Sequence, residues 1–435
     1  MTEKPTFTQR LNLPYLMGVY AAVNGLRDAY LLVDGPQCVS FKAEHLSAKH
    51  DWRSTLLDPS GFHRIVMTGT TFDSVAFDRE DTVVRLLGRI AERPEAGVVM
   101  VSCLTMCGLT GIQYERLIRP LAARTGKPFL EVRADSLEED WLDGYAAVWE
   151  ALARTADVRP IRKRKDAVVL VGHLMDRNEA DGPANIAELS RMLAGAGLEL
   201  VSSWPSGGSY GDLSRAGAAS AVVCLPYARS TGKALARRLK VPIIETGLPF
   251  GLKASADWLR SVARPMGRVK EAERFIDAEL KALLPGLEFA VPQVFLNRRL
   301  LYAGDPHLLE GFLGMAETLG FNVTAAATSR TGRLGPLGAA LAPAALEEPE
   351  EAVWLSEARA RGPFDLCVLS HPAWAVLGGE AGPVMEFGFP SHFHHALAPA
   401  PFLGLRGFFH FADRMAEHLM AGRMRAVERR SSAGA

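Results

Sequence analysis

The sequence predicts an α/β protein made of three Rossmann-like βαβ domains with mainly parallel sheets. Short apolar runs alternate with longer helical stretches along the chain, and this alternation is typical of parallel strands joined by crossover helices. The chain has 435 residues, which suggests two or three domains, and 48% of its residues are apolar, which allows a sizeable core.

The first domain is expected over residues 1–160. Four apolar runs predict its strands, at 29–33, 64–67, 97–101 and 128–132. Helices are expected at 113–124 and 137–155. The basic connector from Arg159 to Lys165 is expected to close this domain as a solvated linker.

The second domain is expected over residues 161–285. The run at 167–171 is apolar and rich in valine, which indicates a strand buried on both faces. Further strands are expected at 198–201, 221–224 and 241–244, and helices at 184–196, in the stretch that ends at Lys240, and at 253–263.

The third domain is expected over residues 286–435. Its strands are predicted at 299–302, 322–324 and 364–369, with a helix at 307–319. The stretch 329–362 is rich in Ala, Pro, Gly and Glu, so we expect an insertion that is partly helical at 350–360 and carries no chemistry. The polar tail 423–435 is expected to be disordered.

Charge and composition exclude several classes of protein. Lysine plus arginine and aspartate plus glutamate each total 49, so neither nucleic acid nor an anionic membrane is indicated as a partner. No apolar run reaches the ~20 residues of a membrane span, and the polar start of the chain does not resemble a signal peptide. Five scattered cysteines do not form a disulfide framework, so we expect a reduced, cytoplasmic location.

Three of the five cysteines share one position within the predicted units. Cys38, Cys103 and Cys224 each lie at or just past the carboxyl end of an apolar strand, where open parallel sheets bind ligands. Thiolate is a soft ligand suited to iron–sulfur clusters. Cys107 is either a further ligand or a core residue, and no second pair supports a zinc site with Cys103. Cys367 lies inside a strand and is expected to be core.

The histidines give a second signal near the end of the chain. The segment Ser391 to His395 (SHFHH) places three imidazoles in a loop bounded by Gly and Pro residues. Imidazole binds iron and zinc, so this loop is a candidate ligand loop. A surface loop whose histidines form local hydrogen bonds is the alternative interpretation.

Taken together, these segments resemble nitrogenase component 1 and its relatives. The segment from Val33 to Cys38 (VDGPQC) is similar to the family's strand, His-Gly-Pro-like turn and cluster cysteine. The segment from Met100 to Cys103 (MVSC) is similar to the strand that ends in the family's second cluster cysteine. The resemblance extends over about residues 11–420 and implies an iron–sulfur cluster at Cys38 and Cys103.

Two later segments extend the resemblance. Cys224, followed by a helix and a Val-Pro strand start, resembles the cysteine that binds the terminal iron of the nitrogenase cofactor. The segments 387–390 (FGFP) and 402–407 (FLGLRG) resemble the family's Gly-Phe-Pro and Gly-Tyr-x-Gly elements. Counting back from Pro401, the family's cofactor histidine falls on His394, and His392 and His395 compete for that assignment.

Two departures from the family pattern bear on the substrate and the cluster. Pro14 stands where many members have an additional cluster cysteine, so the chain offers one ligand fewer. A partner subunit or Cys107 could supply the missing ligand, or the cluster could be smaller. The helical stretch 144–149 lacks the histidine that nitrogen-reducing members present to the cofactor, which disfavours dinitrogen as the substrate.

The resemblance implies one subunit of a two-component reductase. A separate ATP-dependent iron protein would supply electrons, since no Walker motif is present in this chain. A 4Fe–4S or 8Fe–7S type cluster at Cys38 and Cys103, with Cys107 as a candidate ligand, would relay them across an interface with a homologous subunit, in a heterotetramer or homodimer. A second site between the domains would use Cys224 and His394 to hold a larger iron–sulfur cofactor, and Arg229 could stabilise its negative charge.

Three functions follow from the resemblance. Reduction of small organosulfur compounds, as in methylthio-alkane reductases, fits the missing histidine better than nitrogen fixation does. A tetrapyrrole reductase is the second, although such enzymes need neither Cys224 nor His394. The third is a cofactor-assembly scaffold that is not an enzyme, and a histidine ligand that retains its cargo argues mildly against it.

Overall fold

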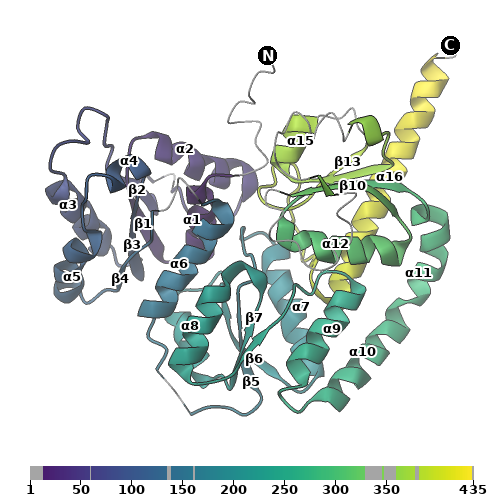
Figure 1. Cartoon of the computed structure of the whole chain (residues 1–435), viewed down its shortest axis with the longest axis horizontal. Helices are drawn as coiled ribbons and strands as arrows, with labels where there is room; N and C mark the ends of the chain where they lie inside the picture. The colour runs from purple at the N-terminus through teal and green to yellow at the C-terminus, as the bar shows by residue number, and fades with distance from the viewer. Residues whose placement is uncertain are drawn as a thin grey trace. The chain divides into compact units, whose positions relative to one another are not determined.

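The chain folds into two compact units (Figure 1). The computed structural model describes residues 13–58, 60–134, 139–159, 162–328, 345–346, 359–377 and 382–433. One unit comprises Leu13–Ile186 and Leu198–Thr246 and contains two sheets, so we call it the two-sheet unit. The other comprises Met1–Asn12, Ala187–Gly197 and Gly247–Ala435, and we call it the one-sheet unit.

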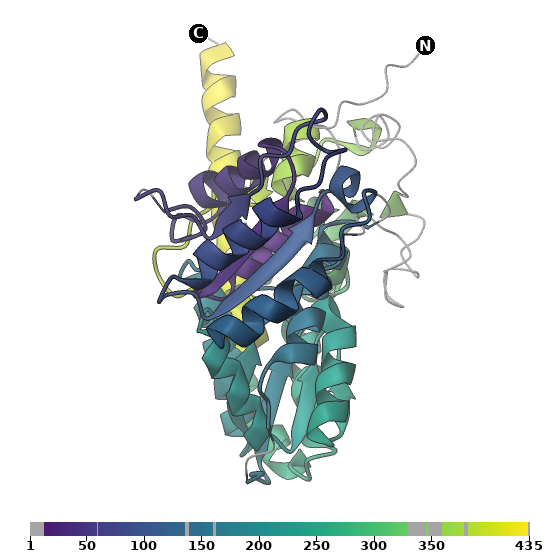
Figure 2. The ribbon, with the colours of Figure 1, turned by 90° about the vertical axis from the view of Figure 1, so that its left-hand side faces the viewer.

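The first sheet is parallel throughout, with the strand order β2-β1-β3-β4. Its strands are β1 (Ala29–Asp34), β2 (Ile65–Met67), β3 (Val98–Cys103) and β4 (Phe129–Glu131). The helices α3 (Glu80–Ala91) and α5 (Tyr114–Thr125) pack on one face, and both can be followed in Figure 2. Every residue of β1 and β3 is buried, as expected for a parallel sheet covered on both faces.

The second sheet is also parallel and has the order β6-β5-β7-β8. Its strands are β5 (Ala167–Val171), β6 (Glu199–Trp204), β7 (Ala221–Cys224) and β8 (Ile243–Glu245). The helix α6 (Trp141–Thr155) packs against α8 (Arg229–Leu239), and α7 covers Asp181–Gly195.

A tight helix crossing lies inside the two-sheet unit. The helix α1 (Tyr15–Asn24) is buried along its whole length and packs on α6. A Cβ on Gly18 would lie 1.6 Å from the carbonyl oxygen of Trp141, and a Cβ on Gly144 would lie 2.1 Å from that of Tyr15. Only glycine allows two helix backbones to approach this closely, so the pair fixes where α1 crosses α6.

The third sheet lies in the one-sheet unit and has the order β11-β10-β9-β12-β13, again with parallel pairs. Its strands are β9 (Arg299–Gly304), β10 (Asn322–Thr328), β11 (Ala345–Leu346), β12 (Leu366–Leu369) and β13 (Val384–Glu386). Within its described residues, this unit includes the helices α9 (Leu252–Ala263), α10 (Val269–Leu283), α11 (Pro285–Ala290), α12 (Pro306–Leu319), α15 (His371–Leu377) and α16 (Gly404–Ala433).

The predicted fold class is confirmed, because three mainly parallel sheets are surrounded by helices. The domain limits at 160/161 and 285/286 stay a prediction. Most of the expected insertion at 329–362, including the helical part at 350–358, lies outside the described residues. None of the helices in the described ranges is long and apolar enough to cross a membrane.

One expectation was wrong. The tail 423–435 was expected to be disordered, but α16 continues through it to Ala433. Beyond Gly422 the sequence contains no proline or glycine before Gly434, and it is rich in the strong helix formers Arg, Ala, Met and Glu. A polar composition therefore does not by itself indicate that a segment lacks secondary structure.

Candidate functional site

The carboxyl edge of the first sheet carries two of the predicted cluster cysteines. Cys103 is the last residue of β3, and its backbone is in register with Asp34 at the end of the neighbouring strand β1. Cys38 follows β1 by four residues and begins α2 (Cys38–His45). Cys103 is buried and Cys38 is exposed. Both residues therefore belong to the same edge of one parallel sheet.

The thiols at this edge have different surroundings. Cys103 and Cys107 lie in one core cluster with Tyr114 of α5, and Cys107 belongs to the short helix α4 (Thr105–Gly108). Burial raises the pKa of Cys103 to about 12 and that of Cys107 to about 11. Cys38 lies instead near Tyr20 of α1, whose pKa is raised by burial and by the Cys38 charge. The structure thus groups Cys103 with Cys107 more closely than with Cys38.

Asp34, the last residue of β1, is a buried acidic residue at this edge that the sequence analysis did not single out. It is fully buried, and its carboxylate accepts hydrogen bonds from Tyr114 Oη (2.7 Å) and Arg79 Nη2 (3.1 Å). The hydroxyls of Thr68 and Thr70 donate to its other oxygen at 2.7 and 3.0 Å. Burial alone would raise its pKa, but these donors hold the pKa below its usual value. An ionised Asp34 therefore joins β1 to the segments that follow β2 and β3.

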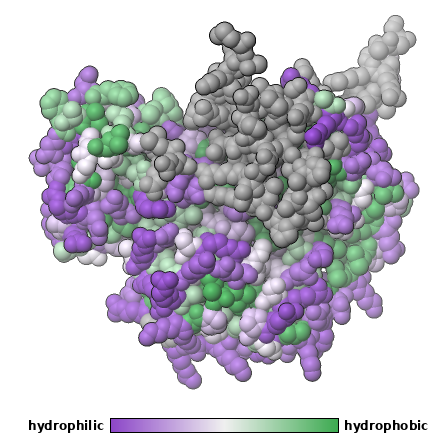
Figure 3. Space-filling model, viewed as in Figure 1, coloured by the Kyte–Doolittle hydropathy of each residue, from purple (hydrophilic) through white to green (hydrophobic). Residues whose placement is uncertain are grey.

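Apolar side chains gather at the same edge of the first sheet. Phe41 follows β1, Phe72 and Phe77 follow β2, and Leu109 follows β3. All are exposed, and the exposed fraction reaches 84% for Phe72 and 82% for Leu109. Figure 3 shows apolar surface on this part of the two-sheet unit. Contiguous exposed apolar side chains mark surfaces that bind other proteins or ligands.

Cys224 ends β7, at the carboxyl edge of the second sheet. It is fully buried, and its Sγ lies 3.7 Å from the carbonyl oxygens of both Leu225 and Ala228. A Cβ on Gly232 of α8 would lie 2.3 Å from this sulfur, so the glycine leaves the space that the thiol occupies. Burial raises the pKa of Cys224, and the neighbouring Arg229 opposes that shift.

Arg229 begins α8 and supports the backbone around Cys224. Its Nη1 donates to the carbonyl oxygen of Cys224, and its Nη2 donates to that of Thr246, just past β8. These bonds link the ends of two neighbouring strands. They also leave the charge of the guanidinium beside the Cys224 thiol, where it favours the thiolate.

His173 is a second residue that sequence reasoning missed. It follows β5 directly after Gly172 and is 1% exposed. Neither ring nitrogen has a hydrogen-bond partner within the described part of the chain. Burial lowers its pKa to about 4, and Asp176 opposes the shift. The residue is thus a neutral imidazole at the same sheet edge as Cys224, and no repeat or spacing in the sequence singles it out.

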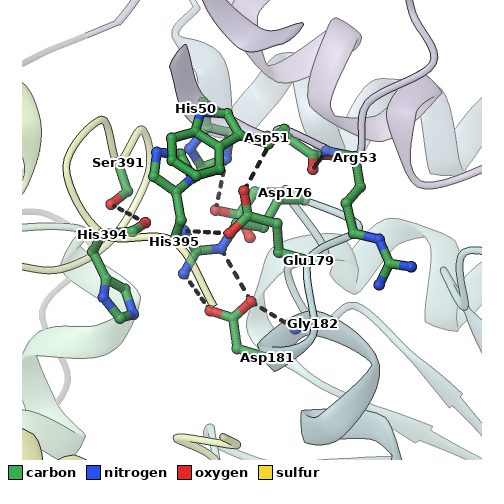
Figure 4. A network of polar contacts seen from close by, with 12 residues as sticks. His50, Asp51, Arg53, Asp176, Glu179, Asp181, Gly182, Ser391, His394 and His395 are labelled. Atoms are coloured by element: carbon green, nitrogen blue, oxygen red, sulfur yellow. Dashed lines mark hydrogen bonds and ion pairs between the residues drawn. The ribbon is translucent and has the colours of Figure 1, made fainter. Parts of the chain in front are cut away.

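A network of polar contacts surrounds the loop after β5 (Figure 4). His50 Nε2 lies 3.2 Å from Asp176 Oδ2. The backbone N–H of Asn178 donates to Asp51 Oδ2 at 2.9 Å. Arg177 forms an ion pair with Asp181. All of these residues belong to the two-sheet unit, so the network connects the loop after β5 to the chain that follows the π-helix Leu46–His50.

The histidine loop follows β13 in the one-sheet unit and is held by Glu386. The backbone N–H groups of His392, Phe393 and His394 donate to the Glu386 carboxylate at 2.9, 2.7 and 3.0 Å. Ser391 Oγ donates to the same carboxylate at 2.8 Å and also lies 3.3 Å from the carbonyl oxygen of His394 (Figure 4). Burial would raise the pKa of Glu386, but these donors and His371 lower it to about 2.

The predicted site residues therefore fall into separate groups. Cys224 and Arg229 belong to the two-sheet unit, and His394 belongs to the one-sheet unit. Cys367 lies in β12 and is fully buried, and burial raises its pKa to about 12, as expected for a core cysteine. Among the described residues, no three His, Cys, Asp or Glu side chains form a metal-binding group by themselves.

The chain is therefore an α/β protein with parallel sheets. Its candidate ligands, cysteine thiols and a histidine loop, lie at the carboxyl ends of the strands. Comparison with known proteins gives the family. The chain belongs to the nitrogenase component 1 type oxidoreductases, whose family model matches residues 15–420. No curated protein matches the sequence.

Two solved structures share the fold. The structure of nitrogenase Cp1 at pH 6.5 matches with a TM-score of 0.77 and 17% identity, over 97% of this chain and 95% of that chain. Nitrogenase Cp1 at pH 5 matches with a TM-score of 0.68 and 13% identity, over 92% of this chain and 87% of that one. The predicted membership of the nitrogenase component 1 superfamily is confirmed.

Proposed function

We propose that the chain is a subunit of a nitrogenase-like two-component reductase. A separate ATP-dependent iron protein supplies electrons, and the reaction reduces a small substrate at an iron–sulfur cofactor. The observation that carries the proposal is the convergence of Cys38 and Cys103 on one edge of the first sheet, in a member of a family of oxidoreductases. Thiols at the carboxyl ends of neighbouring parallel strands suit an iron–sulfur cluster.

The donor chemistry at this edge fits a cluster. Cys38 and Cys103 are the proposed ligands, and Cys107 is a candidate for a third, because it shares a core cluster with Cys103. When bound, the cluster supplies one-electron transfer. Burial raises the pKa of the Cys103 and Cys107 thiols, and metal binding would displace their protons. Asp34 and its partners Arg79 and Tyr114 hold the strand ends in place.

A partner subunit fits the surface around Cys38. Cys38 is exposed. Exposed apolar side chains lie in the segments that follow β1, β2 and β3, namely Phe41, Phe72, Phe77 and Leu109. A homologous component 1 subunit, in a heterotetramer or a homodimer, would cover this apolar surface and complete the ligand set. Pro14 stands at the position where many members of the family have another cluster cysteine.

The second proposed site uses Cys224 and His394 as ligands of a larger iron–sulfur cofactor, with Arg229 beside the thiol. Sulfur and imidazole are donors that iron accepts. The charge of Arg229 favours the Cys224 thiolate, and Glu386 fixes the backbone that carries His394. Reductive cleavage of a methylthio-alkane is the reaction we favour: two electrons and two protons break one C–S bond and give a thiol and a hydrocarbon.

The test is an electron-delivery assay on the anaerobically purified chain with any co-purifying subunit. The iron protein from the same source, a reductant, MgATP and a methylthio-alkane are added, and thiol and hydrocarbon are measured. We expect product that depends on ATP and stops when ADP replaces it. Bound iron without ATP-dependent electron uptake would support an assembly scaffold instead. ATP-dependent reduction of a tetrapyrrole without C–S cleavage would support the tetrapyrrole reductase.

A further inference from the structure

One carboxylate organises the whole histidine loop. Glu386 is the last residue of β13, and its side chain is 4% exposed. Oε2 accepts hydrogen bonds from Ser391 Oγ and from the backbone N–H groups of Phe393 and His394. Oε1 accepts from the backbone N–H of His392 and lies 3.1 Å from Nδ1 of His371, the first residue of α15. One buried side chain therefore holds the loop backbone at three successive residues.

The arrangement requires a carboxylate and not merely a polar group of similar size. A carboxylate only accepts hydrogen bonds, whereas a glutamine amide replaces one oxygen with an NH₂ group that only donates. Four of the groups that contact the Glu386 carboxylate are hydrogen-bond donors, and the fifth is a nitrogen of His371. A glutamine NH₂ group at the Oε1 position would face the backbone N–H of His392, and one at the Oε2 position would face three donors, even though glutamine has nearly the same shape. A buried donor without an acceptor destabilises the conformation that contains it.

The neighbouring histidine rings make contacts within the loop and with α15. The His392 ring stacks on the His371 ring, with centroids 3.5 Å apart and an interplanar angle of 32°. His395 Nε2 lies 3.2 Å from the carbonyl oxygen of His392. Glu386 holds the backbone N–H groups of both His392 and His394, but the stack directs the His392 ring toward α15. These contacts favour His394 over His392 as the residue that faces a ligand.

We propose that Glu386 is a positioning residue, which fixes the backbone of residues 391–394 so that the His394 imidazole is presented to its ligand in one orientation. The inference rests on the proposed role of His394 as a ligand of an iron–sulfur cofactor. The carboxylate itself acts through the loop and does not touch the ligand. Neither the family membership nor the counting from Pro401 assigns a role to this residue.

The test compares Glu386→Gln with His394→Ala and with the control Glu310→Gln, in the full chain purified anaerobically with its partners. Glu310 is an exposed glutamate of α12 in the same unit. Hydrogen–deuterium exchange of the peptide that contains residues 391–395 is measured by mass spectrometry. We expect exchange at least about tenfold faster in Glu386→Gln and unchanged in Glu310→Gln, because at least one backbone N–H among residues 392–394 loses its acceptor.

Pulsed EPR then separates positioning from simple stability. An imidazole nitrogen bound to iron gives a hyperfine coupling, and we expect this coupling to disappear in His394→Ala and to be lost or strongly altered in Glu386→Gln. Unchanged exchange in Glu386→Gln overturns the proposal, as does faster exchange with an unaltered nitrogen coupling. If wild type shows no imidazole coupling, or His394→Ala retains it, the proposed ligand role of His394 fails regardless of Glu386.

Discussion

Replacement of Cys103 by alanine is expected to remove at least about half of the iron bound to the anaerobically purified chain. Cys103 ends β3 in register with the end of β1, and its thiol is buried with Cys107. A cluster without this ligand loses its attachment to the fixed end of β3. Iron and sulfide counts per chain, with the iron absorption band, measure the effect.

The matched control is Cys367→Ala. Cys367 is also a buried strand residue, but it lies in β12 and packs in the core of the one-sheet unit. This variant is expected to keep its iron. Cys38→Ala should lose iron as Cys103→Ala does, and Cys107→Ala shows whether that thiol is a ligand. Full iron content in both Cys38→Ala and Cys103→Ala contradicts the proposed cluster at the first sheet.

The second large effect is expected from Asp34→Asn. The substitution keeps the shape of the side chain but removes the charge that faces Arg79, which is only 6% exposed. An uncompensated buried charge typically costs ~3–5 kcal/mol, so we expect the free energy of unfolding to fall by about that amount. Urea unfolding, followed by tryptophan fluorescence and circular dichroism, measures the change.

Two further variants identify the cause of that loss. Asp73→Asn alters an exposed aspartate in the segment after β2 and should change stability by less than about 0.5 kcal/mol. Asp34→Asn combined with Arg79→Met removes both charges and should be less destabilised than the sum of the single variants, because the two groups interact directly. Strict additivity would show that the ion pair is not the reason for the loss.

The sequence predicted the sheets well because the strands are short, buried and rich in branched apolar residues. The runs at 29–33, 167–171 and 221–224 match β1, β5 and β7 within one residue at each end. Strand β13 was missed, because its three residues are too few to show a period. The boundaries of helices were less well predicted, and α7 begins three residues before the expected helix.

Residues at the candidate sites were predicted only where their position along the chain is informative. Cys38, Cys103 and Cys224 were found because each follows an apolar run. Asp34 was missed because its partners come from segments far away in the sequence, such as Tyr114, which lies 80 residues beyond Asp34. Glu386 was missed because the short strand β13, which it ends, was itself not predicted. No local pattern encodes such partners, although an apolar strand that ends in an acidic residue is a usable signal.

The choice among the three loop histidines also depends on spatial contacts that the sequence does not show. Counting from Pro401 favoured His394 but left His392 and His395 as competitors. The stack of His392 on His371 depends on the position of α15, which spacing in the sequence does not give. His392 and His394, two positions apart, are therefore distinguished by ring contacts that the sequence does not show.

The measurement that tests the central claim most directly is a count of iron, sulfide and other metals in wild type and in Cys224→Ala, purified anaerobically with any partner. The account predicts clearly more than about four iron atoms per chain in wild type, and loss of a defined fraction of them in Cys224→Ala while the cluster at the first sheet remains. About four iron atoms or fewer in wild type, together with no change in Cys224→Ala, would contradict a separate cofactor at Cys224.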